Sequence, residues 1–206
     1  MAHHRALRYA LPALLLSGSL LVSGCGGGAT AGPSPTGGPS SEAATADPRP
    51  TPASSTAPAR NVPVPALPEA AKQNTREGFE AFVRHYIDLL DYAYQTGDTK
   101  PALAVADPGC NMCNTITKDA STISVQSWLV GGRLQASEIS VDASPDIDSI
   151  WLAYLSLTQA PYVDYAPTGP LATTSPSPLK GLVARGEFTE GAWRMFDLGT
   201  PKGAKK

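Results

Sequence analysis

The stretch "NTREGFEAFVRHYIDLLDYAYQTG", residues 74–97, decides the fold, because it carries the clearest helical pattern in this chain of 206 residues. Its apolar side chains recur every three or four residues, as on one stripe of a helix. Asn74, with Glu77 three residues later, resembles a capping-box start, and Gly97 is typical of a helix end. The stripe consists of Phe79, Phe82, Val83, Tyr86, Leu90 and Ala93, with Ile87 and Tyr94 on its flank. The pattern predicts a helix of roughly 20 residues that packs on a core.

The opposite side of this helix carries charge. Glu80, Arg84 and Asp88 follow one another at i, i+4 spacing, which stabilises a solvated face. Asp88 and Asp91 are therefore expected in solvent. His85 lies between the apolar stripe and the charged face, where it fits a boundary histidine bonded to a neighbouring group. The alternative is a general base that acts with Asp88 or Asp91 in a small-molecule enzyme.

Two shorter helices are expected next. Asp98 or Thr99 can cap the first of them, and Pro101 suits its opening turn. The chain then breaks at residues 107–109 before a second helix over about residues 110–122.

After Trp128 the apolar period changes to that of strands. A change of parity within residues 134–141 predicts a bulge near residues 137–138. Residues 150–157 are apolar on both faces, which indicates a central strand, and residues 182–198 form a hairpin pattern. Helices before strands predict an α+β domain, with N-terminal helices packed on a curved, mainly antiparallel sheet.

The segment between these strands, residues 160–179, is rich in proline and is predicted to be a long loop, either functional or floppy. Tyr162 and Tyr165 near its base suit simple packing, or a cover over a pocket. A pocket between the helix of residues 79–94 and the sheet is a further expectation. Its candidate lining residues, each of which also suits a core, are Tyr86, Trp128, Trp151, Tyr154 and Trp193.

The N-terminus reads as an export signal. Basic residues precede a mostly apolar run from Tyr9 to Val22, too short for the roughly 20 residues of a membrane-spanning helix. The stretch "LLVSGCGGG", residues 20–28, resembles the lipobox of bacterial lipoproteins. That resemblance implies cleavage before Cys25 and acylation of its thiol, palmitate included. The alternative is an ordinary signal peptide followed by an incidental thiol.

Four regions follow: a lipoprotein signal peptide (1–24), a disordered tether rich in Pro, Ser, Thr and Gly (25–73), one globular domain (74–200) and a basic tail (201–206). The tether is read as passive, with an O-glycosylated stalk as the alternative. Membrane lipid is the partner implied at Cys25. The expected location is the outer face of the cytoplasmic membrane, towards the cell wall.

The expected export of the chain favours a disulfide between Cys110 and Cys113, because thiols pair outside the cytoplasm. We predict a structural disulfide between them, and a redox-active pair at a helix start is the alternative. The chain has no second C-x-x-C motif for zinc and no dinucleotide or phosphate-binding glycine motif, so no metal or cofactor is expected. A formal net charge of −2 argues against nucleic acid as a partner.

Residues 74–113, "NTREGFEAFVRHYIDLLDYAYQTGDTKPALAVADPGCNMC", look like part of an uncharacterised family of actinobacterial lipoproteins, known as a domain of unknown function. The element order is also similar to the nuclear-transport-factor-2-like cone, in which helices cover a sheet and leave a pocket. Such cones host several functions. The expected function is a binding or scaffolding module of the cell envelope, with an envelope protein or a small molecule as partner. An enzyme that uses His85 is the rival. An interaction subunit that uses an open sheet face is the third class.

Overall fold

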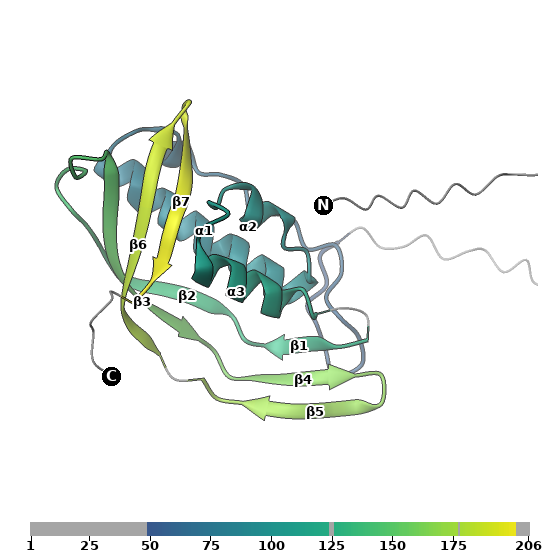
Figure 1. Ribbon diagram of the computed structural model, residues 1–206. Coiled ribbons are helices and arrows are strands. Elements are labelled where there is room, and N and C mark those ends of the chain that lie inside the picture. The colour runs from purple at the N-terminus through teal and green to yellow at the C-terminus, as the bar shows by residue number, and fades with distance from the viewer. Residues whose placement is uncertain (1–48, 124–125, 177, 201–206) are drawn as a thin grey trace, which may run out of the picture. The chain divides into compact units, whose positions relative to one another are not determined.

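The computed structural model describes residues 49–123, 126–176 and 178–200, which all belong to one compact unit (Figure 1). The expected signal peptide, the lipidation residue Cys25, the tether up to residue 48 and the basic tail lie outside the described residues. Helices precede strands, so the predicted α+β class is confirmed. The elements in chain order are η1 (Glu69–Lys72), α1 (Arg76–Thr96), α2 (Lys100–Ala104), α3 (Asn111–Ala120), β1 (Trp128–Gly131), β2 (Leu134–Val141), β3 (Ile150–Gln159), β4 (Tyr162–Ala166), β5 (Gly169–Thr174), β6 (Leu179–Thr189) and β7 (Ala192–Gly199).

Helix α1 ends where the sequence predicts but begins with a different cap. The predicted cap Asn74 is wrong, because Thr75 holds that position and its hydroxyl accepts a hydrogen bond from the Gly78 amide at 3.0 Å. The Asn74 side chain instead accepts a bond from the Trp151 indole at 3.1 Å. Gly97 has φ +76°, and its amide donates to Ala93 at 2.7 Å. Helix α1 therefore stops at a left-handed glycine, as expected.

The strands form two antiparallel sheets. The larger sheet has the order β2-β3-β6-β7, which confirms the strand at residues 150–159 as central, and the smaller has the order β1-β4-β5 (Figure 1). The predicted bulge is present in β2, where the register shifts between Ser137 and Ser140. The β6–β7 hairpin turns at Glu190 and Gly191, both with positive φ, as a two-residue hairpin turn requires.

The prediction of a long loop over residues 160–179 is wrong, because most of this segment forms the hairpin of β4 and β5. Prolines misled the prediction, since proline removes a backbone donor and is excluded from central strands. Here Pro161 precedes β4, Pro167 lies in the turn, and Pro170 lies in β5, an edge strand. An edge strand has one side on which a donor is not needed.

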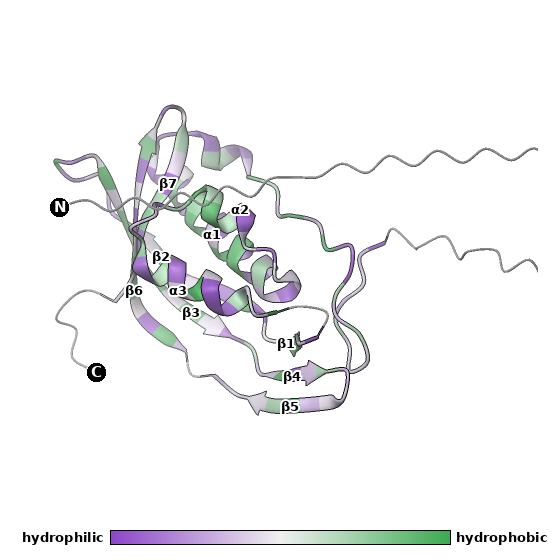
Figure 2. Cartoon of the chain, turned by 45° about the vertical axis from the view of Figure 1, so that its right-hand side comes forward, coloured by the Kyte–Doolittle hydropathy of each residue, from purple (hydrophilic) through white to green (hydrophobic). Residues whose placement is uncertain are grey.

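The main core lies between α1 and the inner face of the larger sheet. Helix α1 carries both hydrophobic and hydrophilic residues (Figure 2), and its predicted apolar stripe is buried. Phe79 packs against Trp193, with ring centroids 5.0 Å apart. Gly186 permits this approach, because a Cβ atom there would lie 2.3 Å from the Phe79 ring. Aromatic rings therefore fill the space between helix and sheet.

A smaller cluster of Ile123, Trp128 and Leu129 lies against the smaller sheet. Trp128 stacks on Tyr165, with ring centroids 6.2 Å apart. Tyr162 also packs against the cluster, so both tyrosines of the supposed loop are packing residues.

The N-terminal strap, residues 49–72, packs on the domain, which corrects the expected tether. Thr51 and Arg60 pair through two backbone bonds of 2.9 Å, and Ser54 accepts a bond from the Trp128 indole at 2.7 Å. Ala71 is buried in the main core. The sequence pattern did not predict this packing, because the strap contacts the domain through backbone groups and the small side chain of Ala71. Its larger apolar side chains Val64 and Leu67 are exposed. The domain therefore begins near residue 49, not at residue 74.

Candidate functional site

The five aromatic residues proposed as pocket lining do not meet around one cavity. Tyr86, Trp151 and Trp193 are buried in the main core, so their rings occupy the space where the pocket was expected. Trp128 belongs to the smaller cluster, and Tyr154 lies on the outer face of the larger sheet with 46% of its surface exposed. The packing of the four buried rings stabilises the fold.

Two polar atoms in this core have no partner among the described residues: the Tyr86 hydroxyl and the Trp193 indole nitrogen. Burial raises the pKa of Tyr86 well above its ordinary value, so its hydroxyl stays protonated. An unpaired buried hydroxyl costs free energy, because it has lost its hydrogen bonds to water.

His85 is buried on the flank of α1, and Asp88 is exposed one turn along the helix. Burial lowers the pKa of His85, and the nearby charge of Asp88 acts in the opposite direction. The imidazole is therefore neutral at pH 7. The structure thus brings the two predicted groups within electrostatic reach of each other.

Asp91 is not on a solvated face, and that expectation is wrong. Its carboxylate accepts bonds from the Leu134 amide at 2.9 Å and from the Gln95 side chain at 2.8 Å, and it forms an ion pair of 3.0 Å with Arg133. Burial raises its pKa, and the Leu134 amide, Arg133 and Gln95 oppose the shift. Asp91 therefore joins α1 to the start of β2. The helical pattern could not show this, because the partners Leu134 and Arg133 lie more than 40 residues away in sequence.

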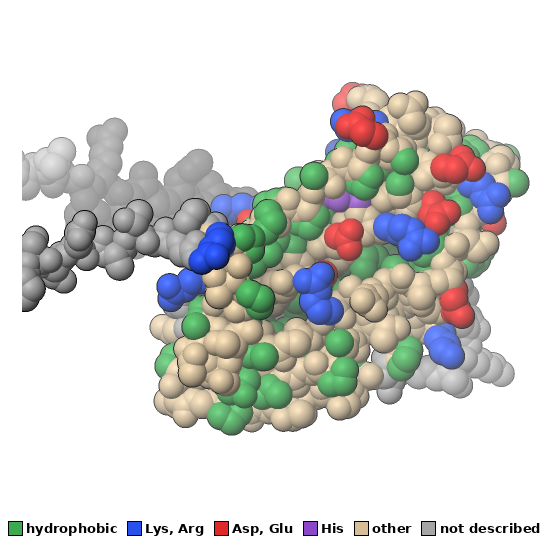
Figure 3. All heavy atoms as spheres, turned by 180° about the vertical axis from the view of Figure 1, so that it is seen from behind, with side chains coloured by type: hydrophobic (Ala, Val, Ile, Leu, Met, Phe, Trp, Pro, Cys, Tyr) green, Lys and Arg blue, Asp and Glu red, His purple; other side chains and the backbone are tan. Residues whose placement is uncertain are grey.

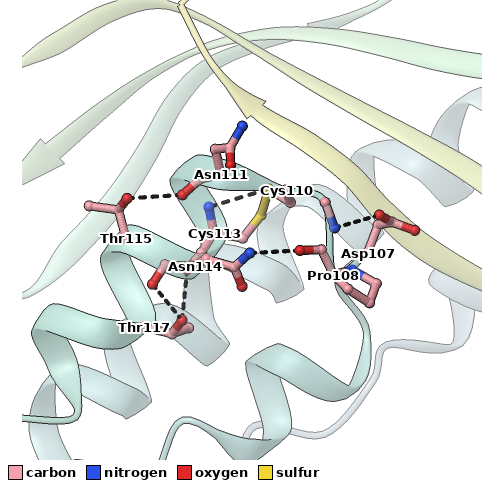
Figure 4. The surroundings of a disulfide bond; sticks show 9 residues. Asp107, Pro108, Cys110, Asn111, Cys113, Asn114, Thr115 and Thr117 are labelled. Carbon is pink, nitrogen blue, oxygen red and sulfur yellow. Dashed lines mark hydrogen bonds between the residues drawn. A yellow bond between two sulfur atoms is a disulfide. The ribbon is translucent and has the colours of Figure 1, made fainter. Parts of the chain in front are cut away.

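The predicted disulfide between Cys110 and Cys113 is present, with Cα atoms 5.3 Å apart (Figure 4). Cys110 caps α3, and its sulfur accepts a bond from the Cys113 amide at 3.3 Å. The turn before it is held by Asp107, whose carboxylate accepts a bond from the Gly109 amide. Both cysteines are fully buried, so an external thiolate has no path to either sulfur. This geometry favours the structural interpretation over the redox alternative.

An apolar pocket of about 210 Å³ lies between helices α1 and α3 and the strands β2, β3 and β6 of the larger sheet. The C-terminal turn of α1 contributes Tyr94, α3 contributes Ile116, and the inner faces of β2 and β3 contribute Leu134 and Leu157. The complete lining is Tyr94, Ile116, Leu134, Leu157, Gln159, Pro176 and Leu179. We call this cavity the apolar pocket.

Two residues with polar groups, Tyr94 and Gln159, lie among the hydrophobic walls, and the Gln159 amide nitrogen donates to the Gly132 carbonyl at 3.3 Å. Burial raises the pKa of Tyr94 to about 12, and the charge of Asp119 adds to the shift, so the hydroxyl remains a donor. A well-known engineered protein cavity of about 150 Å³ binds benzene. The apolar pocket therefore has room for an aromatic ring or a branched aliphatic group.

The apolar pocket lies at one end of the helix and sheet between which a pocket was expected, but none of the five predicted lining residues lines it. Its walls come from segments far apart in the chain, and the lining residues Pro176 and Leu179 belong to the supposed loop. Two sequence features pointed to residues of the apolar pocket: the inward-facing position of Leu157 in its strand and the position of Tyr94 on the flank of the helical stripe. Neither reveals a cavity before the elements are assembled.

In the described part of the chain, no group of three or more His, Cys, Asp or Glu side chains could hold a metal ion. No helix within that part is both long and apolar enough to cross a membrane.

Comparison with known proteins gives one match. A model of a family of unknown function, DUF6318, matches residues 49–198, which begin at the strap and end in β7. No curated protein and no solved structure matches the chain. The chain therefore belongs to the DUF6318 family of unknown function.

Proposed function

We propose that this protein is a membrane-anchored binding module of the cell envelope, which holds an apolar group of its ligand in the apolar pocket. The observation that carries the proposal is the pocket itself: about 210 Å³, with walls of leucine, isoleucine and proline and only two residues with polar side chains, Tyr94 and Gln159. Binding sites for small molecules have this composition, with few polar groups among apolar walls.

The membrane anchor is supported by the N-terminal sequence. Small residues precede Cys25 in the manner of a lipobox, and one acyl chain alone binds a membrane only weakly, whereas a diacyl unit supplies two. Because the domain begins near residue 49, residues 26–48 form the connection to the lipid. Even fully extended, these residues would reach roughly 80 Å, so the domain would work close to the outer face of the membrane.

Intact-mass analysis of membrane-extracted protein tests the anchor. We expect cleavage before Cys25 and an acylated N-terminus, and we expect Cys25→Ser to abolish both. A soluble chain with an unmodified Cys25 would end this part of the proposal.

A cone of the nuclear-transport-factor-2-like type is the fold we infer for the domain. The support is the element order, with three α-helices before the strands and the long helix α1 against the larger antiparallel sheet. The apolar pocket opens between the helices and the larger sheet, where a cone of this type leaves its cavity. This likeness concerns architecture and leaves the ligand to be determined from the site.

Ligand-detected NMR with fluorobenzene tests the binding function. We expect binding with a Kd of roughly 1 mM, which corresponds to about 4 kcal/mol. Ile116→Trp places a large ring in the apolar pocket and should abolish binding. The matched control, Leu171→Trp, adds the same ring at an exposed position of β5 and should bind like the native chain. Equal binding by both variants would show that fluorobenzene does not occupy the apolar pocket, and the proposal would fail.

A further inference from the structure

Arg133 occupies a position that two glycines make possible. Gly131 and Gly132 have φ angles of +92° and +76°, and they carry the chain from β1 of the smaller sheet to β2 of the larger one. A Cβ atom at Gly131 would lie 2.5 Å from the Pro161 carbonyl oxygen, and one at Gly132 would lie 3.2 Å from the Tyr162 side chain. The chain can make this tight turn only with glycines, and the turn places Arg133 at the junction of the two sheets.

The guanidinium of Arg133 is held by the buried carboxylate of Asp91. The side chain of Asp91 is 4% exposed, and its carboxylate lies 3.0 Å from one terminal nitrogen of Arg133, whose own side chain is 62% exposed. Asp91 is fixed in turn by the Leu134 amide and Gln95. Among the described residues, this ion pair is the one polar contact of the guanidinium, so its other N–H donors have no protein partner there.

Three surface hollows meet at Arg133. The first has a volume of about 440 Å³ and the second about 620 Å³, and the strap forms one wall of each, with residues 50–53 in the first and 62–66 in the second. The third, of about 470 Å³, lies between α1 and β2. Seen from behind, the molecule has a hollowed face on which acidic and basic side chains lie next to each other (Figure 3).

The walls on the strap side are mainly apolar. The first hollow is lined by Pro50, Pro52, Ala53, Val62 and Leu129 besides its polar members Thr51, Gln95 and Arg133. The second hollow has prolines and valines of the strap on one side and the acidic residues Asp88 and Asp91 near the guanidinium. A ligand that reaches Arg133 through these hollows therefore meets hydrophobic surface on its way.

We propose that Arg133 is the centre of a second binding site, which takes a carboxylate carried on a short apolar chain, such as the end of a peptide. A carboxylate matches the guanidinium fork in shape and charge. The negative charges of Asp88 and Asp91 disfavour a dianionic phosphate more strongly than a monoanion, because repulsion grows with ligand charge. The arginine is already positioned, so binding orders few additional groups.

The guanidinium does not line the apolar pocket, and the two hollows walled by the strap share no lining residue with that pocket, whereas the third hollow shares Leu134. The strap, which sequence analysis read as part of a passive tether, supplies its hydrophobic walls. The two sites can therefore be tested separately, and the Ile116→Trp variant should still bind a carboxylate.

Amide-detected NMR titration of the isotope-labelled mature chain with N-acetylvaline tests the proposal. The amide analogue N-acetylvalinamide and inorganic phosphate serve as comparison probes. We expect N-acetylvaline to shift signals around Gly131–Arg133 and in the strap, and we expect the amide to bind at least roughly tenfold more weakly. Phosphate should also bind more weakly than N-acetylvaline.

Arg133→Gln should weaken N-acetylvaline binding at least roughly tenfold, and Arg133→Lys, which keeps the charge but loses the fork, should bind with intermediate affinity. The matched control is Arg84→Gln, because Arg84 lines the third hollow only and pairs with Glu80 at 2.8 Å. The control should bind like the native chain. Equal binding of acid and amide by the native chain, unchanged binding in Arg133→Gln, or tighter binding of phosphate would each overturn the proposal. The acid–amide comparison needs no variant, so it decides the question even if Arg133→Gln fails to fold.

Discussion

Replacement of Asp91 by alanine tests whether this carboxylate joins α1 to the larger sheet. The variant leaves the Leu134 amide without its acceptor, and an unsatisfied buried amide costs about 1–3 kcal/mol. Loss of the bond from Gln95 adds about 1 kcal/mol. The ion pair adds only about 0–1 kcal/mol, because Arg133 is largely exposed and water screens it. The expected total is about 2–5 kcal/mol of unfolding free energy.

Urea unfolding followed by tryptophan fluorescence measures this loss. The control is Asp88→Ala, an exposed position on the same helix, where the change should stay within about 0.5 kcal/mol. A loss for Asp91→Ala no larger than that of the control would refute the reasoning, because Leu134 would then have found another acceptor or the helix would not depend on this contact.

The same residue predicts a pH dependence. The pKa of Asp91 is raised above its ordinary value of 3.8 in the folded protein, chiefly by burial. The folded state therefore binds the proton more tightly than the unfolded chain, and this contribution to stability is complete below pH 3.8. It is lost as the pH rises through the raised pKa. Asp91→Asn does not titrate, so native stability relative to this variant should fall as the pH rises from 3 to 7, and a flat difference would contradict the raised pKa.

Three further predictions concern packing. In a thermal melt, a chain that begins at residue 49 should unfold at the same midpoint as the mature protein. Removal of the strap should lower the midpoint clearly, because Ala71 is then missing from the core. Equal midpoints would mean that the strap contributes nothing to stability. Tyr86→Phe removes the unpaired buried hydroxyl and should be neutral or should stabilise by up to about 1 kcal/mol, so a large loss in urea unfolding would reveal a hidden partner. Gly186→Ala drives a methyl group towards the Phe79 ring and should cost about 1–3 kcal/mol, and an unchanged unfolding midpoint would contradict this close packing.

Local patterns were enough to predict several elements correctly. The stripe of α1, the glycine at its end, the bulge in β2 and the β6–β7 hairpin each depend on neighbours within a few residues. The disulfide was predicted from the expected export of the chain, and its two cysteines are only three residues apart, so their pairing needs no distant segment. Each of these features is decided by short-range geometry.

Features that depend on distant partners were missed. Strand β5 was not predicted, because it contains a proline. Proline is compatible with an edge strand, but β5 is known to be an edge strand only once the sheet order β1-β4-β5 is known. The burial of Asp91 depends on Leu134 and Arg133, which belong to another element. Sequence periodicity reports which face of a helix is apolar, but not which polar residue a second element covers.

By itself, the sequence determined the α+β class, the helical stripe, the central strand and the cysteine pair, since hydrophobic periodicity and turn chemistry act locally. Tertiary structure alone decided that residues 49–72 pack on the domain, that aromatic rings fill the space under α1, and that cavities remain beside Tyr94 and Arg133. The physical reason is that a cavity is the volume left between elements after they pack. Its position depends on contacts between residues far apart in the chain, and no local pattern contains those distances.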